Sequence, residues 1–167
     1  YPLSSPAGEA AVLEGVLGEA EVRIGSSHRY GGLLRYVVAP EGIFDAEVLR
    51  RVDAVAHQAH CSGGRNAAGG VAGRLRELFP QADPYRGRPP KPELGQFFST
   101  PGSFEICEGD GKSVSVINLF SQRDPGGPQH PKQGDGQKQR LEWFRESLTG
   151  LAAVPELPTS IAFPWQV

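Results

Sequence analysis

The sequence predicts an α/β fold in which a mixed central sheet lies between helices. A small, apolar run at residues 52–59 leads into a glycine-rich loop and then into a stripe of apolar residues at helical spacing. Two β-rich runs flank a turn at residues 108–111, and a second helical stripe covers residues 137–152. Strands that alternate with helices favour a sheet covered on both faces, with a ligand cleft at the carboxyl ends of its central strands.

Length and composition predict one soluble, globular domain. The chain has 167 residues, of which 38% are hydrophobic and 22% charged, so it can bury a core of its own. Seventeen basic and 19 acidic residues give a net charge of −2, so we do not expect it to bind nucleic acid. No apolar run approaches the roughly 20 residues that span a bilayer, so no membrane association is expected.

The cysteine count and the start of the sequence indicate where the protein is found and how far the chain extends. Two cysteines cannot build a disulfide framework, which favours an intracellular protein, cytoplasmic or nuclear. The sequence begins with Tyr1 and contains no methionine, so we expect it to be part of a larger parent protein. Residues 1–31 are interpreted as an N-terminal extension, with a short helix at 9–18 and a strand at 20–24. Residues 32–167 are expected to form the main domain.

The first half of this domain is predicted to contain two strands and a helix. Residues 33–39 are β-rich and stop at Pro40, as a strand should. The run 52–59 reads as a buried strand that ends in a glycine-rich loop. From Gly69 onward apolar residues recur at helical spacing until Pro80 closes the segment.

The second half is predicted to contain three strands and one helix. Five prolines in residues 82–103 indicate an irregular loop. Residues 103–107 and 113–120 read as strands, and a polar loop at 121–136 precedes a helix over 137–152. The apolar stripe of that helix is formed by Leu141, Phe144, Leu148 and Leu151. A short strand is expected at 160–163.

The glycine-rich loop is a candidate phosphate site. A helix start presents unpaired backbone N–H groups and the positive end of the helix dipole, and residues 67–72 carry almost no side chains that would keep a diphosphate away. The P-loop motif is excluded because Val71 follows Gly70 where a lysine is needed, and the glycine spacing does not fit the dinucleotide fingerprint. The alternative is a tight turn that needs glycine only for its geometry.

Several stretches together resemble the macro domains. They are residues 55–61 (VAHQAHC), 68–72 (AGGVA) with 78–80 (LFP) behind them, 116–122 (VINLFSQ) and 160–165 (SIAFPW). Their order and spacing are similar to that family from about residue 33 to the end. The resemblance is greatest to the branch that includes the terminal ADP-ribose protein glycohydrolase and the ADP-ribose-1″-phosphate phosphatases. It implies a macro-type α/β/α fold that binds ADP-ribose or an ADP-ribosylated protein and needs no cofactor.

The resemblance also implies the residues that contact the ligand. Gly42 stands where the family has an aspartate that receives the adenine amino group, and Asp45 is the nearby candidate to replace it. His60 stands where many relatives carry an asparagine near the distal ribose. The full set of implied ligand-binding residues is Gly42, Ile43, Asp45, His60, Cys61, Ala68, Gly69, Gly70, Val71, Ala72 and Phe163.

Catalysis is expected to be weak or silent. Family members continue past the strand that matches residues 161–164 into a second glycine-rich loop, further helix and strand, whereas this sequence ends at Val167. Ser121 stands where the glycohydrolase carries its catalytic lysine, which leaves Asp124 as the candidate general base. The alternatives are a hydrolase of ADP-ribosyl linkages or of ADP-ribose 1″-phosphate, and an interaction domain that has lost the ligand.

The end of the strand at 52–59 carries residues that could serve two other chemistries. A metal site is not expected, because His57 and His60 point to opposite faces of a strand and no second ligand cluster exists. Cys61 is a candidate nucleophile beside a helix start, with His60 or His130 as its base. The alternative is that Cys61 is a small, buried side chain.

Overall fold

The computed structural model describes residues 22–26, 33–37, 42–65, 69–93, 95–109, 114–127 and 134–164. The chain divides into two compact units, Tyr1–Val48 and Leu49–Val167. In the first unit β1 (Val22–Ser26) pairs antiparallel with β2 (Leu33–Val37). β1 contains residues 22–24 of the strand expected at 20–24, while the helix expected at 9–18 lies outside the described residues.

A short helix that the sequence did not predict, α2 (Ala46–Arg51), follows a turn at Gly42. Gly42 has a φ of 84°, a left-handed conformation that favours glycine. The Asp45 carboxylate caps the helix, since its Oδ1 accepts hydrogen bonds from the backbone N–H of Glu47 at 2.8 Å and of Val48 at 3.3 Å. Six residues are too few to show a periodic apolar stripe, which is why α2 was missed.

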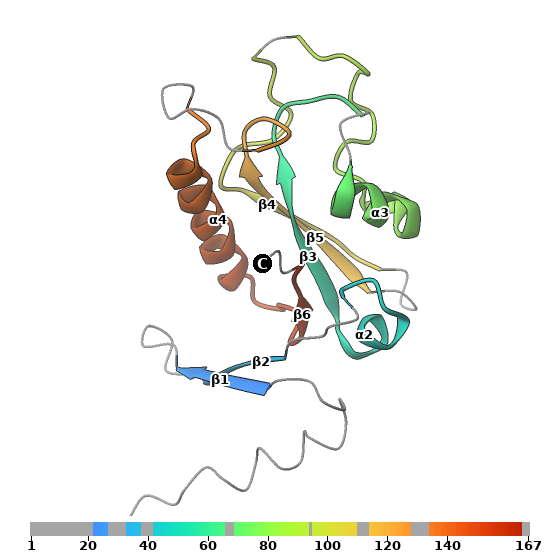
Figure 1. Ribbon diagram of the computed structural model, residues 1–167, viewed down its shortest axis with the longest axis vertical. Coiled ribbons are helices and arrows are strands. Elements are labelled where there is room, and N and C mark those ends of the chain that lie inside the picture. The colour runs from blue at the N-terminus through green and yellow to red at the C-terminus, as the bar shows by residue number, and fades with distance from the viewer. Residues whose placement is uncertain are drawn as a thin grey trace, which may run out of the picture. The chain divides into compact units, whose positions relative to one another are not determined.

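A four-stranded mixed sheet forms the centre of the second unit (Figure 1). Its strands are β3 (Ala54–His60), β4 (Phe104–Cys107), β5 (Ser115–Gln122) and β6 (Ile161–Ala162), in the order β4-β5-β3-β6. β5 and β6 run parallel to β3 on either side of it, and β4 runs antiparallel to β5. The predicted α/β fold with a mixed sheet is therefore confirmed.

Helices cover both faces of this sheet (Figure 1). On one face α4 (Gln137–Ala152) packs Phe144, Leu148 and Leu151 against a cluster that includes Ala56 and Ile117. On the other face α3 (Gly70–Leu78) and the 3-10 turn η1 (Pro80–Ala82) cover a smaller cluster. That cluster contains Ala59, Cys61, Tyr85 and Phe120, with Ala72 of α3 packed on it.

One member of the predicted α4 stripe was wrong. Leu141 is 47% exposed, whereas Arg140 beside it is buried. The inward position in this turn of the helix is taken by the Arg140 side chain, which forms an ion pair with the buried Asp135. At this one position a local polar interaction has thus put Arg140 inward in place of Leu141, while Phe144, Leu148 and Leu151 pack as predicted.

A buried polar pair joins β3 to β5 on the α3 side. The Asn118 side-chain amide donates to the Ala82 carbonyl at 3.1 Å and to Glu105 Oε2 at 3.2 Å, which leaves its oxygen as an acceptor. His57 Nε2 donates to that oxygen at 2.7 Å. Burial is the main influence on His57 and lowers its pKa, so the ring is held neutral in the folded protein.

Acid should destabilise the second unit through His57. Because the folded pKa lies below the ordinary value of 6.5, the unfolded state binds the proton first as the pH falls below 6.5. We expect the free energy of unfolding to fall by up to about 1.4 kcal/mol per pH unit from this group, until the folded pKa is reached. Urea unfolding of the wild type and of His57→Gln across this range measures the effect. Equal pH slopes for the two proteins would contradict it.

Candidate functional site

The loops that follow β3 and β5 lie side by side at the carboxyl end of the sheet. The parallel pairing continues past the strands, because Cys61 N–H donates to the Gln122 carbonyl and Ser62 N–H to the Arg123 carbonyl, both at 2.8 Å. Ser62 Oγ then donates to Asp124 Oδ1 at 2.6 Å. The loop after β3 and the candidate base Asp124 are therefore brought together, as expected for neighbouring parallel strands.

The Arg88 side chain holds the loop after β3 through hydrogen bonds to its carbonyl groups. Arg88 is 6% exposed, and its Nη1 donates to the Ser62 carbonyl at 2.9 Å. The same Nη1 lies 3.3 to 3.4 Å from the carbonyl oxygens of residues 60, 61 and 63. The guanidinium thus binds several carbonyl groups where the chain leaves the sheet, in addition to their other partners. The Cys61 carbonyl also accepts from Phe98 N–H at 3.0 Å, and the Ser62 carbonyl is bonded to His60 Nδ1.

Gly64 lets the same loop approach a proline-rich segment. A Cβ built on Gly64 would lie 2.8 Å from the carbonyl carbon of Pro90 and closer still to the carbonyl oxygens of Pro89 and Pro90. Arg65 N–H donates to the Pro89 carbonyl at 3.3 Å. All three obstructing atoms belong to backbone, so they cannot move aside as the end of a flexible side chain would.

The start of α3 is open. Gly69 is the N-cap, with a φ of −131°, and Gly70 has a left-handed φ of 53°. Both are exposed, and a Cβ built on either meets no described atom within 4 Å. Val71 and Ala72 follow in the first turn, half-buried, while Ala68 lies outside the described residues. The first-turn N–H groups thus lie beside two exposed positions at which no described atom would crowd a Cβ.

A buried ion pair shapes the loop after β5. Asp135 is fully buried and accepts from Arg140 Nη2 at 2.5 Å and Nε at 3.0 Å. It also accepts from the backbone N–H groups of Arg123 at 3.1 Å and Asp124 at 3.2 Å. Arg140 in turn donates to the carbonyls of residues 124, 126 and 127. The backbone groups that contact the pair therefore all have hydrogen-bond partners, and each charge faces an opposite charge. A buried ion pair is tolerated only under these conditions.

Asp124 is held as a carboxylate. Burial alone would raise its pKa, but the hydrogen bonds from Ser62 and Arg123 and the charges of Arg123 and Arg140 outweigh it and lower the pKa. Arg123 Nε donates to Asp124 Oδ2 at 2.8 Å. Asp124 is therefore ionised near neutral pH and is a weak base, because two donors already stabilise its negative charge.

The structure favours the view that Cys61 is a small, buried side chain. Its thiol is fully buried, and burial raises its pKa to about 12 although the charge of Arg88 opposes this. It is therefore a protonated thiol near neutral pH and not an activated nucleophile. His60 stacks on Tyr85 with ring centroids 4.2 Å apart, and its Nδ1 bonds to the Ser62 carbonyl. His130 lies outside the described residues.

The other implied ligand residues lie elsewhere along the chain. Gly42, Ile43 and Asp45 form the turn and cap before α2 in the first unit. β6 pairs residue 162 with residue 55, so the described pairing leaves Phe163, the next residue, well short of the end of β3 at His60. Among the described residues no group of three or more His, Cys, Asp or Glu side chains is placed to hold a metal ion.

The chain matches no protein-family model, no curated protein and no solved structure. Within the described part of the chain, no helix has both the length and the apolar character needed to cross a bilayer. The resemblance to macro domains therefore rests on the sequence stretches alone, and it stays a prediction.

Two glycines of the β3–α3 loop should respond differently to alanine. Gly64→Ala forces a Cβ into the backbone of Pro89 and Pro90 and should lower the free energy of unfolding by about 1–3 kcal/mol. Gly69→Ala adds a Cβ in open space at an ordinary φ, so its effect should stay within about 1 kcal/mol. Urea denaturation of both variants measures the difference, and equal losses would contradict the close packing at Gly64.

Removing the charge of Asp135 should destabilise the fold strongly. Asp135→Asn leaves Arg140 buried without a carboxylate, and we expect a loss of about 3–5 kcal/mol in the free energy of unfolding. Asp124→Asn is the matched control, since its ion pair with Arg123 is partly exposed and should contribute about 1 kcal/mol or less. Denaturant unfolding that ranks the control as the more damaged variant would contradict this role of Asp135.

Proposed function

We propose that this chain is an ADP-ribose-binding module of the macro type, with the diphosphate seated at the N-terminus of α3. The single observation that carries the proposal is the open helix start at Gly69 and Gly70, where a Cβ would meet no described atom within 4 Å. In sequence it follows the loop whose Ser62 donates to Asp124. The resemblance of the sequence stretches supplies the identity of the ligand. The partner is free ADP-ribose or an ADP-ribosylated protein.

The backbone conformation requires glycine more strongly at Gly70 than at Gly69. At Gly70 the left-handed φ of 53° is itself a reason for glycine. At Gly69 the φ of −131° and the described neighbours leave room for a Cβ, and the N-cap position favours glycine together with serine, threonine, aspartate and asparagine. Close approach of a ligand favours glycine over these larger residues, because a diphosphate must come within hydrogen-bond distance of the first-turn N–H groups.

Binding is supported better than hydrolysis. Asp124 is an ionised carboxylate that is already held by Ser62 and Arg123, so it is suited to accept a hydrogen bond from a ribose hydroxyl. The same two donors weaken it as a general base, and Cys61 offers no nucleophile. We therefore place the hydrolase alternative second.

Calorimetry with free ADP-ribose tests the proposal on the whole 167-residue chain. Gly70→Asp sets a carboxylate against the diphosphate and should weaken binding at least about tenfold, which corresponds to about 1.4 kcal/mol. Gly70→Asn is the matched control, because asparagine has nearly the same shape and tolerates the left-handed φ without adding charge. Equal affinities for the two variants would remove the helix start from the site, and no binding by the wild type would overturn the function.

A further inference from the structure

The two buried arginines of the second unit are paired differently. Arg140 is 8% exposed and forms an ion pair with Asp135, whereas Arg88 is 6% exposed and has no carboxylate within 4.0 Å among the described residues. Burying a guanidinium without an anion is unfavourable. The carbonyl groups around it compensate the charge in part, as do the rings of Tyr85 and Phe98, whose centroids lie 4.9 and 5.0 Å from the guanidinium carbon. Burial accordingly lowers the pKa of Arg88.

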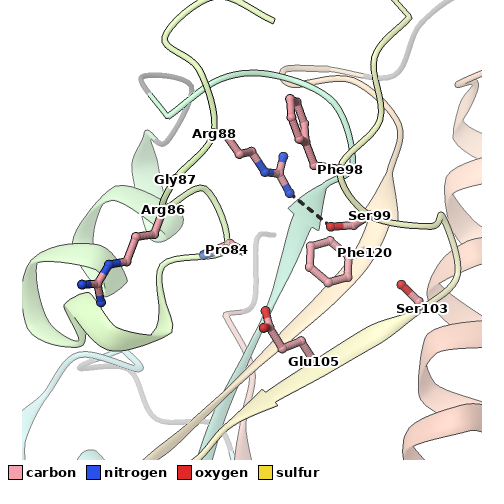
Figure 2. Close-up of a pocket in the computed structure, with 9 residues that line it drawn as sticks. All are labelled: Pro84, Arg86, Gly87, Arg88, Phe98, Ser99, Ser103, Glu105 and Phe120. Carbon is pink, nitrogen blue, oxygen red and sulfur yellow. Dashed lines mark hydrogen bonds between the residues drawn. The ribbon is translucent and has the colours of Figure 1, made fainter.

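Arg88 lies in the wall of an open cavity of about 510 Å³. Figure 2 shows its guanidinium at one end, with the Phe98 ring beside it and Phe120 below, while the Arg86 side chain points away. Glu105 of β4 points toward the same space from the opposite end. Residues 84, 86–88, 98 and 99 line one part of this cavity, and no residue of the α3 helix start lines it.

The donors of Arg88 are only partly used. Nη1 is engaged by the carbonyls after β3, and Nη2 donates to Ser99 Oγ at 3.2 Å. Nε donates to no described acceptor, so this edge of the guanidinium can still receive an oxyanion. A carboxylate has the planar shape that fits such an edge.

The remaining wall limits what else the ligand carries. The Phe98 ring centroid lies 5.0 Å from the Arg88 guanidinium carbon, and Phe98 and Phe120 both line the cavity. They give it apolar surface on which a flat apolar group can pack. Glu105 is exposed, and its Oε2 is fixed by the hydrogen bond from Asn118. The Glu105 carboxylate, at the end of the cavity opposite Arg88, repels multiply charged anions and attracts a cationic group on the far end of the ligand.

We propose that this cavity is a second binding site, one that takes a small aromatic carboxylate with its anion on Arg88. An ammonium group opposite the carboxylate strengthens binding through Glu105. The volume of about 510 Å³ is ample for one aromatic ring with a substituent at each end. The site does not depend on the ADP-ribose proposal, because it uses none of the residues of the α3 helix start.

Benzoate, 4-(aminomethyl)benzoate and benzylamine test the site on the whole chain, with binding followed by shifts of backbone NMR signals. We expect saturable binding of both carboxylates, with the aminomethyl compound at least about threefold tighter, and no saturable binding of benzylamine. The shifts should centre on residues 98–103. Absence of saturation by either carboxylate, or benzylamine that binds as well as benzoate, would overturn the proposal.

Variants separate the two ends of the cavity. Glu105→Gln keeps an acceptor for Asn118, and it should tighten benzoate while it abolishes the preference for the aminomethyl compound. Ser99→Ala frees Nη2 of Arg88 for the ligand and should tighten benzoate at least about twofold. Glu108→Gln is the control: it removes an exposed carboxylate that does not line this cavity, and it should leave both affinities unchanged. A Glu105→Gln protein that retains the preference would contradict the assignment.

Discussion

The carbonyl groups at the carboxyl ends of β3 and β5 have to be satisfied where the chain leaves the sheet, and the arrangement of the loops follows from this requirement. Two buried arginines meet it, Arg88 for the loop after β3 and Arg140 for the loop after β5. Each donates to several backbone oxygens at once. The two loops of the candidate site are therefore held in place by two buried arginine side chains.

Much of the fold could be predicted because it depends on local patterns. The strand at 52–59, the helix over 137–152 and the strand around 113–120 each show their own periodicity, and all three are present. Errors arose where the pattern is short or is overridden. α2 has too few residues for a stripe, and Leu141 is displaced outward by a buried ion pair that no periodicity encodes.

The candidate site was predictable only in part. The change from strand period to helical period at Gly69 is local, so the helix start could be found from the sequence. Arg88 could not, because it lies in a segment without periodicity and its partners are backbone carbonyls some 25 residues or more earlier. A backbone carbonyl can accept a hydrogen bond whatever side chain its residue carries, so the sequence does not show which carbonyls are used. Asp135 was missed for the same reason, since half of its hydrogen bonds come from backbone N–H groups.

The bond between Arg88 and the loop after β3 runs entirely to main-chain oxygens. A main-chain oxygen stays in place whichever side chain its residue carries, so Arg88 itself sets no condition on the side chains at residues 60–63. Other contacts do: Cys61 is fully buried in the core, and Gly63 has a left-handed φ of 79°. Ser62 is the position at which a substitution changes the contact with the neighbouring loop, through Asp124, while the hydrogen bond from Arg88 to its carbonyl is kept.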